Sequence, residues 1–153
     1  MKLRNLYQEV SNPYSAWKRP DMDMLKQEFR VEHEKKGRDN FRSFEDFLKA
    51  IKKAKVISLS DSEDAKIYSR SFTNSFEDLL DLIRGYASYP KYRNKDTLRA
   101  LYQRFKDNKP MDMPIVFEDE SGEREIFSGN TRLDIAFQLG ITPKILLVKV
   151  DQL

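Results

Sequence analysis

The chain has 153 residues, of which 28 are Lys or Arg and 25 are Asp or Glu, so its net charge is +3. This length allows one domain, or one domain with a small appendage, and the small charge excess permits a polyanionic partner without demanding one. The absence of cysteine excludes disulfides, thiolate nucleophiles and sulfur-ligated zinc, and the single histidine cannot build a zinc site.

Up to about residue 53 the sequence predicts helices and turns. Apolar residues recur at helical spacing from Met22 to Phe29, and Gly37 is suited to end that helix. His33 lies among charged residues of this stretch, where we expect a solvated helix position. A second helix is expected to begin after Ser43 as its N-cap. Its apolar stripe consists of Phe44, Phe47, Leu48 and Ile51. Residues 1–53 are therefore predicted to form a helical N-terminal extension.

From residue 54 to residue 153 the pattern is that of a mixed domain. Short strands are expected at 56–59, 115–117, 125–127 and 145–150. The second and third strands read as a hairpin, and the last is apolar enough to be central in its sheet. Helices are expected after Ser75, after Asn94 and from Thr131, the last one ended by Gly140 in a left-handed conformation. The predicted fold class is α+β, with a small mixed sheet and flanking helices.

The most informative segment is EIFSGNTRLDIAFQLG, residues 125–140, in which a strand runs through Ser128-Gly129-Asn130 into a helix. Gly129 has no β-carbon, so a ligand can approach the backbone and a positive φ carries no penalty. The amides that follow would be unpaired donors of the first helical turn, and the guanidinium of Arg132 suits two phosphate oxygens. Such a turn predicts an anionic ligand of the nucleotide kind. The alternative is an ordinary strand-turn-helix in which Ser128 or Asn130 caps the helix and Arg132 is solvated.

The element order and this loop resemble the ParB/sulfiredoxin-like superfamily over roughly residues 54–151. The stretches that carry the resemblance are a strand VISL, paired helices, MPIVFED, a hairpin and FSGNTRLDIAFQLGITPKILLVKV. The tetrapeptide Gly129-Asn130-Thr131-Arg132 stands where ParB proteins have Gly-Glu-Arg-Arg and sulfiredoxins have Gly-Cys-His-Arg. Pro114 matches the Gln-Pro element of the family, with Met113 in place of glutamine.

The resemblance implies that the tetrapeptide binds nucleotide phosphates together with a divalent metal, which means ATP or CTP with Mg²⁺. Gly129 and Arg132 would hold phosphate. Asn130 occupies the place of the sulfiredoxin cysteine, which excludes sulfinic-acid repair, and Asn130 with Thr131 replaces the Glu-Arg of ParB, which leaves CTP selectivity open. No helix-turn-helix region follows before Leu153, so DNA binding of the ParB kind is not expected. Compact stand-alone members occur in phages, and the resemblance therefore implies a phage origin.

The predicted nucleotide-binding residues are Ser128, Gly129, Asn130, Thr131, Arg132, Arg99 and Lys109. Arg99 and Lys109, on or after the preceding helix, would add positive charge, and the alternative for both is a solvated side chain. Asp134 is the candidate Mg²⁺ ligand and catalytic carboxylate, although helix-dipole stabilisation alone would justify an acid there. Asp112 and Glu125, which flank the strands, are further carboxylates within reach.

Two other groups of residues admit two interpretations each. The first, an aromatic-basic cluster, comprises Tyr7, Tyr14, Trp17, Lys18 and Arg19. It has the composition that grips single-stranded nucleic acid, but the simpler interpretation is that the aromatic residues pack the appendage onto the main domain. The second, a basic edge, comprises Lys49, Lys52, Lys53 and Lys55, and such an edge is usually a solvated face.

Together with the loop, the resemblance thus implies a nucleotide-binding protein that carries out Mg²⁺-dependent phosphoryl transfer or nucleoside triphosphate hydrolysis in phage DNA or nucleotide metabolism. The alternative is a non-catalytic module that binds DNA or a host protein through the same loop. A metal-dependent nuclease is the weakest option, because no paired-carboxylate-plus-lysine spacing is present. No apolar run approaches the ~18 residues that span a bilayer, and MKLRNLYQEV has no hydrophobic signal core, so we expect a soluble cytoplasmic protein.

Overall fold

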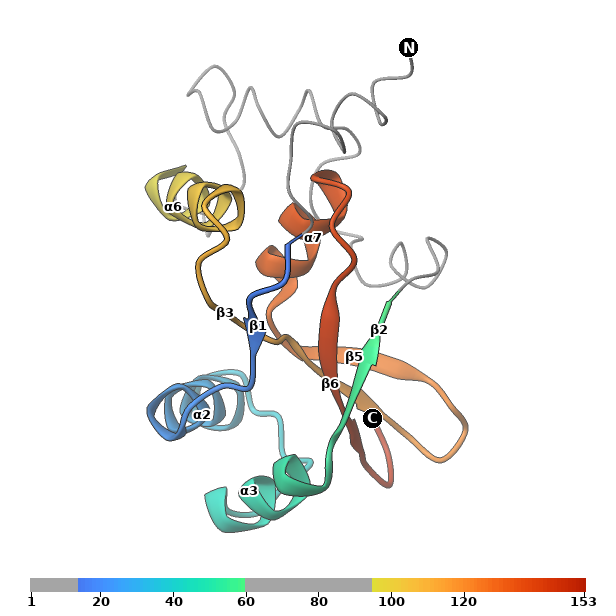
Figure 1. The fold of residues 1–153 in the computed structure, drawn as a ribbon. Helices are drawn as coiled ribbons and strands as arrows, with labels where there is room; N and C mark the ends of the chain where they lie inside the picture. The colour runs from blue at the N-terminus through green and yellow to red at the C-terminus, as the bar shows by residue number, and fades with distance from the viewer. Residues whose placement is uncertain (1–13, 60–94) are drawn as a thin grey trace. The chain divides into compact units, whose positions relative to one another are not determined.

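The computed structural model describes residues 14–59 and 95–153 (Figure 1). The helix expected after Ser75, and Tyr7 of the aromatic-basic cluster, lie outside these residues. The chain divides into two compact units. The helical unit is Met1–Trp17, Leu59–Met111 and Asn130–Pro143, and the sheet unit is Lys18–Ser58, Asp112–Gly129 and Lys144–Leu153.

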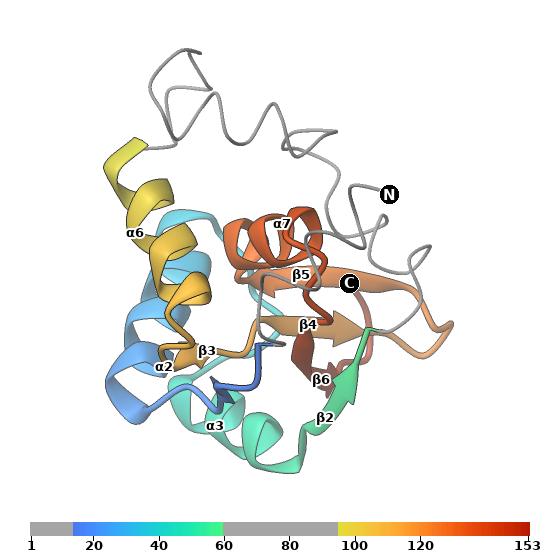
Figure 2. The same ribbon diagram turned by 45° about the horizontal axis from the view of Figure 1, so that its top comes forward.

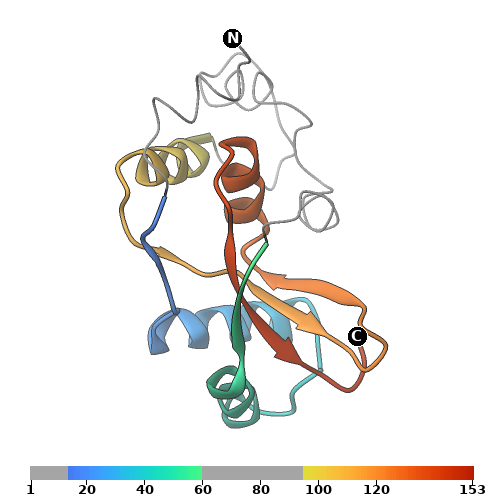
Figure 3. The same ribbon diagram turned by 45° about the vertical axis from the view of Figure 1, so that its right-hand side comes forward.

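The sheet unit is built on a four-stranded sheet with the order β2-β6-β4-β5 (Figure 3). Its strands are β2 (Lys55–Ser58), β4 (Ile115–Glu118), β5 (Arg124–Ser128) and β6 (Lys144–Lys149). β6 is antiparallel to β2 and parallel to β4, while β4 and β5 form an antiparallel hairpin. The prediction of a hairpin, of a central last strand and of a mixed α+β fold is therefore confirmed. β6 has four buried residues in a row because a central strand is covered on both faces.

Three helical segments belong to the sheet unit, namely α2 (Met22–Phe29), η1 (Arg30–Lys35) and α3 (Phe44–Lys53), shown in Figure 2. The side chain of Asp21 caps α2 by accepting from the Met24 amide at 2.9 Å. Ser43 caps α3, as predicted, by accepting from the Asp46 amide at 3.2 Å. Gly37 has φ 71° just beyond η1, as expected for a glycine that ends a helix. The continuation of α2 as a π-helix was not predicted.

Phenylalanine rings form the core between these helices and the sheet. Phe47 of α3 is completely buried, and its ring centroid lies 5.2 Å from that of Phe127 on β5. Phe127 in turn stacks on Phe117 of β4 at 4.6 Å. His33 joins the edge of this cluster by stacking on Phe29 at 4.8 Å, and its Nδ1 lies 2.9 Å from the Arg38 carbonyl oxygen. The expectation of a solvated histidine is therefore wrong, because Phe29 lies one helical turn before His33 and covers one face of its ring.

A buried carboxylate connects η1 to the hairpin. Glu32 is only 4% exposed, and its two oxygens are paired with Lys36 at 2.9 Å and with Arg38 at 3.2 Å. The contact to Arg38 is an ion pair without hydrogen-bond geometry, since Glu32 Oε2 has no hydrogen-bond partner. Arg38 also pairs with Glu125 of β5 at 2.8 Å. One arginine thus neutralises two carboxylates from distant segments.

The described part of the helical unit consists mainly of α6 (Lys95–Lys106) and α7 (Asn130–Gln138), which pack together. Buried Leu133 and Leu139 supply part of the α7 packing, and Gly140 has φ 71°, which confirms the predicted left-handed helix end. Two short strands that were not predicted also occur, β1 (Trp17–Lys18) and β3 (Met111–Asp112), and they pair with each other. None of the described helices combines the length and apolar character required to cross a membrane.

The aromatic residues before β1 are internal. Tyr14 and Trp17 are 8% and 9% exposed, and their ring centroids lie 4.9 and 5.5 Å from that of Phe105 on α6. The Tyr14 hydroxyl donates to the Lys109 carbonyl oxygen at 2.5 Å. These contacts support the packing interpretation of Tyr14 and Trp17, because rings enclosed in this way present no face on which a base could stack.

Candidate functional site

The predicted phosphate loop lies where β5 ends and α7 begins. Ser128 is the last residue of β5, is paired in register with Ile115, and is buried. Gly129 follows with φ 98°, a value that L side chains rarely adopt, so a glycine is required there. α7 begins at Asn130, one residue earlier than predicted. The predicted strand-turn-helix is therefore confirmed, and the chain passes from the sheet unit to the helical unit between Gly129 and Asn130.

The start of α7 differs from the starts of the other described α-helices. α2, α3 and α6 each carry an acidic residue in the first turn, which is the favourable sign at the positive end of a helix. α7 has no acid in its first turn and has Arg132 as its third residue. The residue before α7 is Gly129, so that position offers no side-chain acceptor comparable to Asp21 or Ser43.

The other residues of the predicted site lie in or next to α7 and α6. Thr131 and Arg132 are half-buried in the first turn of α7. Asp134 is the fifth residue of that helix, beyond its first turn, so the dipole is a weaker reason for an acid at this position than the sequence indicated. The side chains of Asn130 and Asp134 lie outside the part of the chain that the structure describes.

The two cations expected from the preceding helix do not lie at the same end of it. Arg99 is in the second turn of α6, is exposed, and its Nη1 lies 3.8 Å from the Asp96 carboxylate. Lys109 follows the last turn of α6, with its amide bonded to the Arg104 carbonyl oxygen at 2.9 Å. Seven residues of helix separate Arg99 from the end of α6, which corresponds to roughly 10 Å along the axis. α6 therefore does not bring Arg99 and Lys109 together.

Two carboxylates suggested as metal ligands already have cationic partners. Asp112 pairs with Lys18 at 2.6 Å, and Glu125 pairs with Arg38 at 2.8 Å. Among the described residues, no three His, Cys, Asp or Glu side chains gather closely enough to hold a metal ion. Mg²⁺ bound with a nucleotide needs only one or two protein carboxylates, because phosphate oxygens and water complete its coordination.

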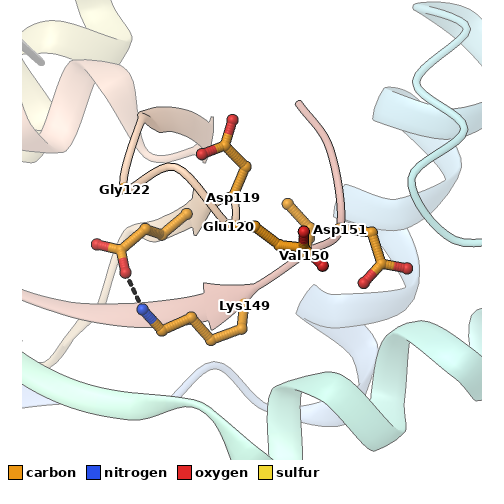
Figure 4. A pocket seen from close by; sticks show the side chains of 7 residues that line it. Asp119, Glu120, Gly122, Lys149, Val150 and Asp151 are labelled. Carbon is orange, nitrogen blue, oxygen red and sulfur yellow. Dashed lines mark hydrogen bonds and ion pairs between the residues drawn. The ribbon is translucent and has the colours of Figure 1, made fainter.

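The sheet unit also contains a hollow of about 360 Å³ that the sequence did not predict (Figure 4). Its lining residues are Glu118, Asp119, Glu120, Gly122, Lys149, Val150 and Asp151. Glu118 is buried and is paired with Lys149 on one side and with Arg124 at 2.7 Å on the other. Because the register places Arg124 and Lys149 beside Glu118 on the two neighbouring strands, this carboxylate is neutralised within the sheet.

Asp119 organises the hairpin loop at the edge of this hollow. Its Oδ1 accepts from the Ser121 hydroxyl at 2.7 Å, from the Ser121 amide at 2.9 Å and from the Glu123 amide at 3.0 Å. The Ser121 hydroxyl is the largest cause that lowers the pKa of Asp119 below its ordinary value; loss of solvation opposes it, and the loop amides add to the lowering. The sequence Asp-Glu-Ser-Gly is typical of a turn closed by its first side chain, and that signal could have predicted this loop.

A second hollow, of about 450 Å³, is lined by Arg38, Asp39, Asn40, Glu125, Asp151, Gln152 and Leu153. Neither of these two hollows includes a residue of the predicted phosphate loop.

No protein-family model matches the chain, and neither the curated proteins nor the solved structures contain a match to it. The ParB/sulfiredoxin-like resemblance therefore stays a prediction.

Proposed function

We propose that this protein binds a nucleoside triphosphate at the N-terminus of α7 and, with Mg²⁺, transfers or hydrolyses its terminal phosphate. The ParB/sulfiredoxin-like resemblance implies the same ligand class. The observation that supports the proposal best is the start of α7, where a glycine with φ 98° replaces a side-chain cap and an arginine replaces the usual acid.

The charge at this helix start is the physical reason for expecting an anion. A helix N-terminus carries the equivalent of about half a positive charge, and its first amides have no acceptor within the helix. Arg132 lies in the same turn and adds a full positive charge to this end of the helix. Phosphate oxygens would accept from the amides and from the planar guanidinium together, which is the usual way in which a helix start and an arginine bind phosphate.

The remaining roles follow from position on the two helices. Arg99 or Lys109, which lie at different ends of the α6 helix that packs with α7, is assigned to the outer phosphates. Asp134 is assigned as the Mg²⁺ ligand and as the acceptor of a proton from the attacking hydroxyl or water. Mg²⁺, when bound, supplies charge neutralisation at the phosphates.

A thermal-shift experiment with each nucleoside triphosphate and Mg²⁺ tests the proposal. At a ligand concentration of 100 Kd the stabilisation is about 2.7 kcal/mol, which corresponds to a rise in Tm of roughly 5–10 °C for a chain of this size. Arg132→Ala should abolish the rise, whereas Arg42→Ala, which removes an exposed arginine beside α3, should preserve it. Release of inorganic phosphate, measured on the same samples, reports hydrolysis.

The absence of a Tm shift with every nucleotide at millimolar concentration would overturn the proposal. A shift that persists in Arg132→Ala would place the nucleotide at a different site. The replacement of the Glu-Arg of ParB by Asn130-Thr131 favours one other candidate, a non-catalytic module that binds DNA or a host protein through the same loop. That candidate predicts that the protein binds DNA or a partner protein and that Arg132→Ala abolishes this binding. It also predicts that no nucleotide shifts the Tm.

A further inference from the structure

A second positively charged surface lies on the sheet unit. We call it the lysine face, and it consists of Lys49, Lys52 and Lys53 of α3 with Lys55 at the start of β2, all four of them exposed. Spacings of three and four residues place the three helix lysines on one side of α3. The opposite side carries Phe47 and Ile51, which are 0% and 5% exposed. Figure 1 shows α3 leading directly into β2, so the four lysines follow one continuous stretch of chain.

The lysine face follows the acidic first turn of α3, which contains Glu45 and Asp46, and no further acid occurs along it. The segment FLKAIKKAKVIS, residues 47–58, contains four lysines and no Asp or Glu, although the whole chain has 25 acids among 153 residues. Among the residues that the structure describes, none of the four lysines forms an ion pair. A fifth cation is fixed at the end of the helix, because Arg19 Nη2 donates to the Ala54 carbonyl oxygen at 3.3 Å.

Structural explanations account for only part of this charge. Lys52 and Lys53 lie in the last turn of α3, where the helix dipole favours cations, and a lysine such as Lys55 protects an edge strand from unwanted pairing. Neither reason applies to Lys49, which lies in the middle of the helix; Glu45 is four residues before it, a spacing that favours pairing, but the two form no ion pair in the described part of the chain. Lys49 and Lys53 are four residues apart, and like charges at that spacing destabilise a helix. A polyanion on this surface would remove that repulsion.

We propose that the lysine face binds the phosphate backbone of a nucleic acid. Lys49 and Lys53 are separated by roughly 6 Å along the helix axis, which is less than two of the steps of about 3.4 Å at which a nucleic-acid strand presents its phosphates, so the lysines span neighbouring phosphates. The cations lie in a row along one helix face and do not converge on a point, which suits a repeating polyanion better than a single small anion. Lysine contacts to phosphate carry no base information, so binding through this face is independent of sequence.

Fluorescence anisotropy with a labelled 25-base-pair DNA duplex, an RNA duplex of equal length and a single strand tests this proposal between 50 and 200 mM salt. Three neutralised phosphates contribute a log–log salt slope of about −2.7, which is roughly a 40-fold loss of affinity over this range. The variant Lys49→Gln/Lys52→Gln/Lys53→Gln should lose that part of the slope and bind at least about tenfold more weakly at 50 mM salt. Far-UV circular dichroism and Tm establish that the variant remains folded.

The matched control is Lys26→Gln/Arg30→Gln/Lys35→Gln, which also removes three positive charges, but from exposed positions of α2 and η1. It should retain the affinity and the slope, as should Arg132→Ala, because the lysine face does not involve the α7 site. Three results would each overturn the proposal. They are the absence of binding to every nucleic acid at 50 mM salt, an equal loss in the control, and equally tight binding of a polyglutamate peptide. Whichever of the three nucleic acids binds most tightly identifies the form that the face recognises.

Discussion

Replacing Phe47 by alanine removes a side chain without exposed surface from the core of the sheet unit. Its ring centroid lies 5.2 Å from that of Phe127, 5.3 Å from Phe29, 5.7 Å from Phe41 and 6.1 Å from Phe44. These neighbours come from α2, from the segment before α3, from the start of α3 and from strand β5. The substitution therefore opens a cavity at a point where several elements meet.

Truncation of a buried phenylalanine to alanine costs about 3–5 kcal/mol of the free energy of unfolding. Each aromatic pair within 4.5–7 Å adds roughly 0.5–1.5 kcal/mol beyond the burial of area, and Phe47 has four such pairs. We therefore expect Phe47→Ala to lie in the upper half of that range, at about 4–5 kcal/mol. A loss of this size approaches the whole stability of many domains.

Urea denaturation followed by far-UV circular dichroism measures this cost, and fluorescence of Trp17 reports the helical unit separately. Phe44→Ala is the matched control, because Phe44 lies three residues earlier in α3, is half-buried, and meets only Phe29 and Phe47 among the described rings. We expect a cost of about 2 kcal/mol for the control. Equal costs for the two variants, or a cost below about 2 kcal/mol for Phe47→Ala, would refute the assignment of Phe47 to the centre of this core.

Three further predictions concern local features. Because the pKa of Asp119 is lowered, its stabilisation of the hairpin loop is present at pH values above the pKa of Asp119 in the unfolded chain and is lost as the pH falls through its pKa in the folded protein. An NMR titration of the Asp119 carboxyl carbon checks this, and a pKa equal to the ordinary value would contradict the loop hydrogen bonds. Gly37→Ala should cost about 1–2 kcal/mol of unfolding free energy, because φ is 71° and alanine is strained there, although its β-carbon would meet no atom within 4 Å. Gly37→Asn should cost less, because asparagine tolerates a positive φ, and equal costs of the two variants in urea denaturation would exclude backbone strain as the cause. Ser43→Ala should cost about 1 kcal/mol by loss of the α3 cap, and an unchanged urea midpoint would show that the Asp46 amide finds another acceptor.

Features that depend on neighbours a few residues away were predicted correctly from the sequence. The Ser43 cap, the left-handed Gly37 and Gly140, and the strand-Gly129-helix order all follow from side-chain and backbone preferences within one turn. The central position of β6 followed from its continuous apolar run, because only a strand covered on both faces has that composition. The local geometry of the candidate site around Gly129 and Arg132 was predictable because it depends on these short-range preferences.

Features that join distant segments were decided by the tertiary structure. Lys18 and Asp112, on the paired strands β1 and β3, form an ion pair although 94 residues separate them, and no pattern within either dipeptide predicts a strand. Arg38 neutralises Glu32 and Glu125, and Glu118 lies between Arg124 and Lys149, although each of these charges looks like a solvated side chain in the sequence. A sequence by itself determines what a residue prefers next to its neighbours along the chain. Which charge becomes buried depends on the partner that folding brings to it, because burial without that partner would cost more than the local preference supplies.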